Sequence, residues 1–319
     1  MSRSDLKVVF MGTPAFSVGI LDAIIHAGFT VAGVVTVADK PAGRGQQISK
    51  SAVKQYAETH NLKIAQPEKL RDESFLDTLK NWEADVSVVV AFRMLPDVVW
   101  KMPKFGTFNL HASLLPDYRG AAPINWAVMN GDRQTGVTTF FIDDKIDTGN
   151  IILQTPMEIG QNETAGELHD RMIDTGSGLV VETLDLIQSG KVNPVAQSTF
   201  TNVQQRAAPK LFKENTRIDW KRGAKAIHDH IRGLSPYPAA WTILKNSNGQ
   251  EKQFKFFKTE VIKEHTSPKL KLWADKEFIY VSYPDATLKI HTLQMEGKKQ
   301  MSSKEWLVGN SISDWNLSS

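Results

Sequence analysis

Residues 7–37, KVVFMGTPAFSVGILDAIIHAGFTVAGVVTV, decide the fold class of this 319-residue chain. The run KVVFM is short and almost wholly apolar, and the GTP that follows is typical of a corner. From Pro14 to Gly28 the apolar residues have helical spacing, and a β-rich run follows. We expect Thr13 to cap this helix and Pro14 to be its first residue. Strand, helix and strand in this order predict a parallel sheet covered on both faces.

The run ADVSVVVAF at 84–92 reads as another buried strand, so the first part of the chain is predicted to be a Rossmann-like α/β domain with a mostly parallel sheet. The first turn lacks the GxGxxG pattern of dinucleotide binders, and a nicotinamide cofactor is not required. The chain also lacks a GxxxxGK[ST] phosphate loop, and no GxSxG elbow surrounds Ser113. The absence of these patterns disfavours P-loop and serine-hydrolase chemistry.

Around residues 188–215 the sequence becomes polar and loses its periodicity, which predicts a linker at about 190–210. An amphipathic helix is predicted within 217–234, and five short β-type segments separated by turn signals follow it. Short strands at this spacing favour a small OB-like β-barrel. We therefore predict a catalytic domain over 1–206 and a C-terminal β-barrel domain over 207–319.

Composition and charge narrow the functional classes. The chain has no cysteine, no apolar run long enough to cross a membrane and no room for a signal peptide before the first strand, so we expect a cytoplasmic protein without disulfides or thiolate metal sites. Residues 1–206 carry 19 Lys and Arg against 23 Asp and Glu, whereas residues 207–319 carry 19 against 12. The basic excess of the last third suggests a polyanion such as nucleic acid, although a solvated lysine-rich surface would have the same composition.

The segment NLHASLLPDYRGAAP, 109–123, begins as a strand and carries polar residues that a core would not hold. Strand alternation puts Asn109 and His111 on one face and Leu110 on the other. Ligands of open α/β sheets bind at the carboxyl ends of the strands, and an amide beside an imidazole suits an oxyanion that develops on a carbonyl. A single strand histidine is, however, more often structural.

An acidic cluster, FFIDDKIDTGNIILQ at 140–154, contains Asp143, Asp144 and Asp147. A calcium loop is disfavoured because glycine is missing from its sixth position and Gln154 falls at its twelfth. The simplest interpretation of DTG is a turn. If Asp147 lay beside His111, it would orient the imidazole as in an acid/base pair.

Over nearly its whole length the chain resembles the methionyl-tRNA formyltransferases, a branch of the folate-dependent formyltransferase family. The resemblance is carried by FMGTPAF at 10–16, DKPAGRG at 39–45, AFRMLP at 91–96, NLHASLLPDYRGAAP, DTGN at 147–150 and IRGLSPYPAAWT at 231–242. It implies transfer of a formyl group from 10-formyltetrahydrofolate, as cosubstrate and without a metal, to the α-amine of initiator methionyl-tRNA. It further implies that residues 207–319 bind tRNA, and we expect a monomer.

The resemblance also implies roles for individual residues. The catalytic positions of the family fall on Asn109, His111 and Asp147. Its folate-binding positions fall on Ser113, Leu114, Leu115, Pro116, Phe92, Met94 and Leu95. The loop that meets the tRNA acceptor arm corresponds to residues 36–50, with Lys40 and Arg44 as tRNA-binding residues. Arg93 departs from the family, which usually has a small residue there.

Two other functions share some of these features. A formyltransferase that acts on a small amine such as a nucleotide-sugar would keep the three catalytic residues, but it would not require PAGRG or the basic C-terminal domain. An RNA-binding protein without catalytic activity would not require Asn109, His111 and Asp147.

Overall fold

The computed structural model describes residues 2–42, 47–201 and 203–317, which form two compact units. One unit comprises Met1–Gly120, Gly136–Met157 and His169–Ala207. The other comprises Ala121–Thr135, Glu158–Leu168 and Ala208–Ser319. Two segments that precede residue 170 thus pack with the C-terminal unit.

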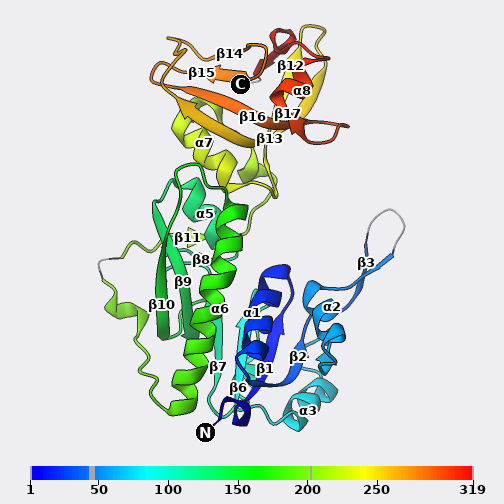
Figure 1. The fold of residues 1–319 in the computed structure, drawn as a ribbon, viewed down its shortest axis with the longest axis vertical. Coiled ribbons are helices and arrows are strands. Elements are labelled where there is room, and N and C mark those ends of the chain that lie inside the picture. Colours follow the sequence, from blue (N-terminus) through cyan, green and yellow to red (C-terminus); the bar gives the residue numbers. More distant parts are fainter. Residues whose placement is uncertain (1, 43–46, 202, 318–319) are drawn as a thin grey trace. The chain divides into compact units, whose positions relative to one another are not determined.

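The first unit is built on a seven-stranded sheet (Figure 1). Its strands, in spatial order, are β10 (Ile151–Glu158), β9 (Gln134–Phe141), β7 (Thr107–His111), β6 (Val86–Val90), β1 (Lys7–Gly12), β2 (Thr30–Val35) and β5 (Ile64–Ala65). Pairing is parallel from β7 through β6, β1 and β2 to β5, whereas β9 runs antiparallel to β7. The predicted α/β fold with a mostly parallel sheet is confirmed.

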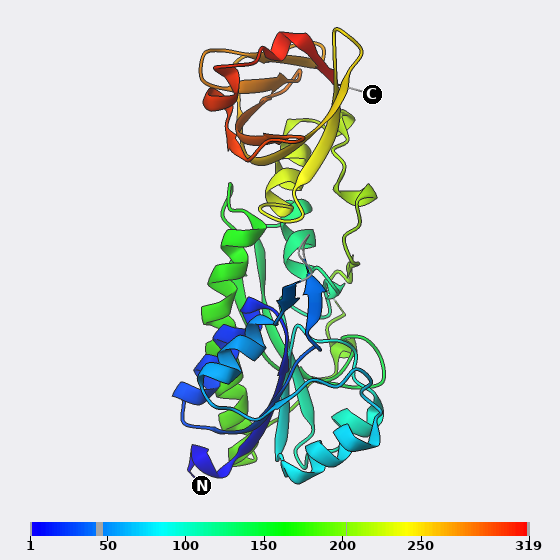
Figure 2. The same cartoon turned by 90° about the vertical axis from the view of Figure 1, so that its right-hand side faces the viewer.

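Helices cover both faces of this sheet, as its apolar strands require. They are α1 (Ala15–His26), α2 (Ala52–Thr59), α3 (Glu73–Asn81), α4 (Asp97–Trp100) and α6 (Ala165–Ser189). On one face α1 and α6 touch, because a Cβ on Gly19 would lie 2.3 Å from the side chain of Ile173. On the other face Met11 shares a buried cluster with Leu79 of α3 and Val99 of α4. Figure 2 shows α1 and α6 on one side of the sheet and α3, in cyan, on the other.

The corner between β1 and α1 differs from the prediction in one detail. The helix begins at Ala15 and its N-cap is Pro14, which is extended and makes no side-chain cap. The Pro14 carbonyl instead accepts from the Ser17 amide, and the Ser17 hydroxyl donates to the carbonyl of Val90 on β6. Thr13 is therefore not the cap, because a proline between it and the helix moves the start one residue along the chain.

Apart from α5 (Pro123–Met129), the remaining elements of the chain before residue 224 are short. They are η1 (Arg3–Asp5), β3 (Lys40–Ala42), β4 (Gln47–Ser49), β8 (Arg119–Gly120), η2 (Gln197–Thr199), β11 (Ala207–Ala208), η3 (Glu214–Thr216) and η4 (Trp220–Arg222). The pairs β3 with β4 and β8 with β11 form two small sheets of their own.

The second unit contains an antiparallel, nearly closed barrel, which confirms the OB-like prediction. Its strands, in spatial order, are β14 (Lys271–Ala274), β15 (Ile279–Ser282), β16 (Thr287–Met295), β13 (Glu251–Ile262), β12 (Ala240–Asn246) and β18 (Trp315–Leu317), with β17 (Met301–Ser302) paired to β16. Figure 2 shows these strands curving around one another. Helices α5 (Pro123–Met129), α7 (Ala224–Gly233) and α8 (Ser303–Leu307) and the turn η5 (Ile312–Asp314) complete the unit.

Helix α7 joins the barrel to the earlier segments of this unit. Its Ile227 and Ile231 belong to the same buried cluster as Phe254 of β13 and Trp306 of α8. A Cβ on Gly233 would lie 2.7 Å from the backbone nitrogen of Met129, so α5 lies directly against α7. This close packing explains why residues 121–135 belong with the barrel.

A buried ion pair on α7 holds a second segment. Arg232 is 3% exposed; its Nε donates to Asp229 Oδ1 at 2.8 Å and its Nη1 donates to the Glu163 carbonyl at 2.9 Å. The Asp229 carboxylate also accepts from Lys225 at 2.5 Å. The segment around residue 163 therefore packs with α7 because its carbonyls satisfy a buried guanidinium.

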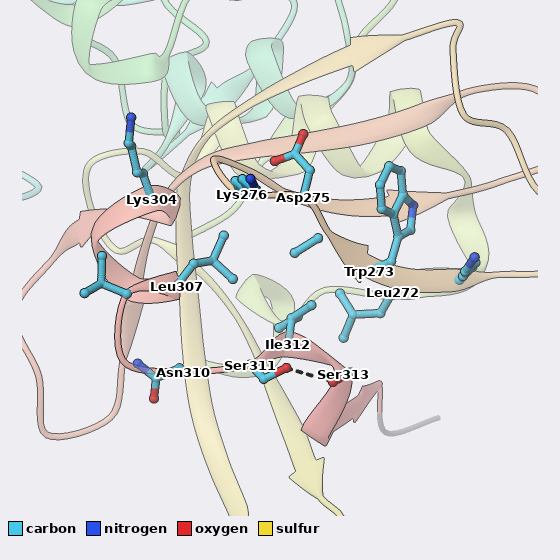
Figure 3. A pocket seen from close by; sticks show the side chains of 13 residues that line it. Leu272, Trp273, Asp275, Lys276, Lys304, Leu307, Asn310, Ser311, Ile312 and Ser313 are labelled. Carbon is cyan, nitrogen blue, oxygen red and sulfur yellow. Dashed lines mark hydrogen bonds between the residues drawn. The ribbon is translucent and has the colours of Figure 1, made fainter.

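A hollow of about 680 Å³ lies where the edge strand β14 faces α8 and η5 (Figure 3). Its lining includes the apolar residues Leu272, Leu307 and Ile312. It also includes three lysines, Lys271, Lys276 and Lys304. Because Lys304 also pairs with Glu277 at 2.8 Å, part of this positive charge is neutralised.

Buried histidines make the stability of this unit depend on pH. His228 is 1% exposed; its Nε2 lies 3.4 Å from the Gln161 carbonyl, and its Nδ1 lies 2.9 Å from the Thr259 hydroxyl. Burial lowers the pKa of His228. The unfolded chain therefore binds a proton at a pH where the folded chain does not, so the free energy of unfolding falls as pH drops below about 6.5.

We expect His228→Gln to reduce this pH dependence, measured by denaturant unfolding between about pH 7.5 and 5.5. The exposed His26→Gln serves as the control and should retain the wild-type slope. If the free energy of unfolding of His228→Gln had the wild-type pH dependence, His228 would not be a source of that dependence.

Candidate active site

Asn109 and His111 lie at the carboxyl end of β7, in the middle of the sheet. Asn109 pairs with Val89 of β6, and His111 pairs with Thr138 of β9. Phe108 and Leu110, which point to the opposite face, are 0% and 4% exposed. The apolar pair anchors the strand in the core. The two polar side chains then lie together at the carboxyl-terminal ends of the strands, where ligands of α/β folds bind.

The Asn109 amide is available to a ligand. In the described part of the chain it has no hydrogen-bond partner, and the residue is only partly buried. An amide with free N–H donors on a rigid strand can stabilise an oxyanion, because such donors need no rearrangement as the charge develops.

The His111 side chain is buried and held between two partners. Its Nε2 lies 2.9 Å from the Tyr118 carbonyl, which can only accept, so Nε2 is the donor. Its Nδ1 lies 3.8 Å from Asp147 Oδ2, which is too long for a direct hydrogen bond. The Tyr118 carbonyl thus fixes the ring and leaves Nδ1 facing the carboxylate.

Asp147 lies in a tight turn after β9. Its φ is +55°, a conformation that is uncommon for a residue other than glycine, and its Oδ2 accepts from the Gly120 amide at 2.9 Å. Two residues on, a Cβ on Gly149 would lie 1.6 Å from the Phe141 carbonyl oxygen, so the turn requires glycine there. The DTG sequence brings the carboxylate to His111 because it allows this compact backbone path.

The segment after His111 is a hydrogen-bonded loop. The Ser113 hydroxyl donates to the Asp117 carbonyl at 2.6 Å, and the Ser113 carbonyl accepts from Thr138. Leu115 belongs to a buried cluster with Phe140 and Ile151. Of the four predicted folate-binding positions in this loop, Ser113, Leu115 and Pro116 are buried and Leu114 is partly exposed. The buried side chains of this loop stabilise its conformation, whereas Leu114 has accessible surface.

The segment after β6 carries the other predicted folate positions. Met94 is 66% exposed and Phe92 is partly exposed, whereas Leu95 is 7% exposed and packs with Val89 and Met11. Because Val89 is the register partner of Asn109, Leu95 anchors this segment on the face of the sheet that carries the amide. Phe92 and Met94 are thereby left as accessible apolar surface.

Arg93, which departs from the family pattern, is tied to the backbone of a neighbouring loop. Its guanidinium donates to the carbonyls of Pro67 and Glu68. The side chain thus links the segment after β6 to the loop that precedes α3. The sequence alone gave no indication of these partners, because they lie about 25 residues away.

The predicted tRNA loop is described only in part. Lys40 is exposed and lies on β3, which pairs with β4, whereas Arg44 lies outside the described residues. The base of the loop is anchored at Asp39, which accepts from Lys54 at 2.5 Å and from Gln66 at 2.8 Å. The hydrogen bond from Lys54 holds the pKa of Asp39 below its usual range, so the anchor is charged at neutral pH.

Within residues 2–42, 47–201 and 203–317, no three His, Asp or Glu side chains are grouped as a metal site would need. His228 and His230 lie two apart on α7, and both are buried. The same parts of the chain contain no helix with the length and hydrophobicity of a membrane span.

The arrangement at the sheet edge suits acyl-type transfer: a free amide donor, an imidazole held by a carbonyl, and a carboxylate near its second nitrogen. Comparison with known proteins agrees with this class. Residues 6–184 match the family model described as "Formyl transferase", and residues 210–311 match "Formyl transferase, C-terminal domain". The chain therefore belongs to the formyl transferase family and is a transferase.

Full-length relatives narrow the assignment within the family. The chain is 50% identical over 317 residues to a methionyl-tRNA formyltransferase of Bacteroides thetaiotaomicron, with 98% of each chain covered. It is 52% identical over 310 residues to that of Flavobacterium johnsoniae, covering 97% of this chain and 98% of the relative. A sugar 3N-formyl transferase, WlaRD, solved with dTDP and 5-N-formyl-THF, has the same fold, with TM-score 0.68 at 22% identity over 92% of this chain and 99% of that one.

Proposed function

We propose that this protein transfers the formyl group of 10-formyltetrahydrofolate to the free α-amine of initiator methionyl-tRNA, in the cytoplasm. The observation that carries the proposal is the Asn109 amide, which has no partner among the described residues, beside the His111–Asp147 pair in a chain half identical to methionyl-tRNA formyltransferases over almost its full length. N-formylmethionyl-tRNA, the product, is the substrate of translation initiation.

The reaction requires stabilisation of the charge on the formyl oxygen and transfer of a proton. The α-amine forms a bond to the formyl carbon, the bond from that carbon to the folate nitrogen breaks, and a proton passes from the amine to the departing nitrogen. Charge develops on the formyl oxygen along the way. Asn109 would donate an N–H to that oxygen, and His111 with Asp147 would take up and return the proton. The folate nitrogen leaves once protonated, so the proposal includes no metal.

The folate would lie against the accessible apolar surface at this sheet edge. Phe92 and Met94, in the segment after β6, and Leu114, in the loop after β7, offer such surface, and pterin and aryl rings bind where apolar side chains surround a few polar groups. Two of the other predicted positions, Ser113 and Leu115, would support the loop rather than touch the cosubstrate.

The tRNA would be held by positive charge. Residues 207–319 carry 19 Lys and Arg against 12 Asp and Glu, an excess that favours contact with phosphates. The loop of residues 36–50 would meet the acceptor end through Lys40 and Arg44, and its base is anchored by Asp39 and Lys54.

An acceptor panel tests the proposal. Labelled 10-formyltetrahydrofolate is incubated with the protein and one of four acceptors: charged initiator tRNA, uncharged tRNA, free methionine or an amino nucleotide-sugar. We expect label only on charged tRNA. Label on the amino sugar alone would favour the small-amine enzyme, and tRNA binding without any transfer would favour a non-catalytic RNA-binding protein.

A further inference from the structure

Gln197 lies in the polar segment between the two ranges that match the family models, yet it is 4% exposed. Its amide is fully used. Its Nε2 donates to the carbonyls of Asp147 and Gly149, both at 2.9 Å, and its Oε1 accepts from Arg119 Nε at 3.0 Å and Nη2 at 2.6 Å. A buried amide whose donors and acceptor all form hydrogen bonds is held rigidly in place.

Gln197 joins two segments that meet at the Asp147 carboxylate, one through backbone carbonyls and the other through the side chain of Arg119. One is the DTG turn, in which Asp147 has a left-handed backbone. The other is Arg119–Gly120, whose Gly120 amide donates to Asp147 Oδ2. Gln197 therefore holds both sides of the hydrogen bond that aims Asp147 toward His111.

Arg206, from the same segment, holds the other partner of His111. Its guanidinium donates to Asp117 Oδ2 at 2.6 Å and lies 4.3 Å from the centre of the Tyr118 ring. Its carbonyl accepts from the Tyr118 amide at 2.7 Å. The Tyr118 carbonyl is the group that receives His111 Nε2. Both neighbours of the imidazole are thus held by Gln197 and Arg206.

We propose that Gln197 and Arg206 are positioning residues for formyl transfer, which set the geometry of the His111–Asp147 pair without touching the substrates. This deepens the proposed function and rests on it for the reaction that is measured. The segment is then part of the catalytic unit rather than only a connection between two domains.

Gln197→Glu tests the proposal. The variant keeps the shape of the side chain and an acceptor for Arg119, but it puts an oxygen in place of the amide donor that faces two carbonyls. We expect kcat for methionyl-tRNA to fall by about 10- to 100-fold, the effect of a small misplacement of a reacting group, with KM for both substrates nearly unchanged. Thr199→Ala, from the same turn, removes only a bond from its hydroxyl to the Ala196 carbonyl and is the matched control.

A second readout does not require activity. The ¹⁵N NMR shifts of the His111 ring nitrogens report its hydrogen bonds, and we expect them to change in Gln197→Glu and to stay as in the wild type in Thr199→Ala. If the wild type fails to formylate methionyl-tRNA, the proposed function is wrong, and altered His111 shifts would still support the positioning role. Unchanged shifts, or a loss of kcat that merely follows the fraction of unfolded protein, would overturn it.

Discussion

Replacing Asn109 by alanine is expected to lower kcat for formylation of methionyl-tRNA by about 10² to 10³, the usual loss when one oxyanion donor is removed. The reason is local: the amide projects from a strand fixed by buried Phe108 and Leu110, and no described residue uses its N–H donors. Since Asn109 would act on the formyl oxygen only as charge develops, KM should change little.

Steady-state kinetics with both substrates varied measures this effect. Asn81→Ala, an exposed asparagine at the end of α3, is the control and should retain the wild-type kcat. A large rise in KM for the tRNA with kcat intact would show that Asn109 contributes to binding and not to the chemical step.

Asp229→Ala is expected to lower the free energy of unfolding by about 3 to 5 kcal/mol, because it leaves a buried guanidinium without its carboxylate. Arg232 is 3% exposed and Asp229 is 5% exposed, so water cannot replace the lost partner. The effect should fall on the unit that contains the barrel, since α7 packs into its core.

Lys225→Met is the matched control for this pair. Lys225 is bound to the same carboxylate, but its side chain is 57% exposed, and its loss should change stability by about 1 kcal/mol or less. Urea unfolding of both variants measures the difference. Equal effects of the two substitutions would mean that burial of the ion pair does not determine its contribution.

Local patterns predicted much of the fold and of the candidate site. The apolar run before Gly12 and the helical spacing after it are local signals, so the α/β sheet could be predicted from them. The alternation in TFNLH likewise predicted that Asn109 and His111 share a face. The approach of Asp147 to His111, 36 residues earlier in the chain, depends on the turn geometry at Gly149 and was inferred only through the family resemblance.

Contacts between distant residues were not visible in the sequence. Gln197 lies in a polar segment without periodicity, and its burial arises from partners about 50 and 78 residues away. The same holds for α5, which packs against α7 more than 90 residues later. Propensity and periodicity report short-range structure, so segments whose order comes from long-range hydrogen bonds read as linkers.

The most direct test of the central claim is a single-turnover experiment in which enzyme in excess, loaded with ¹⁴C-formyl 10-formyltetrahydrofolate, is mixed with methionyl-tRNA. The ester is then hydrolysed and labelled N-formylmethionine is measured over time. We expect rapid labelling by the wild type and loss of most of that rate in the Asn109→Ala, His111→Ala and Asp147→Ala variants, each folded as judged by circular dichroism. Labelling at the wild-type rate by all three variants, or none by the wild type, would contradict this expectation.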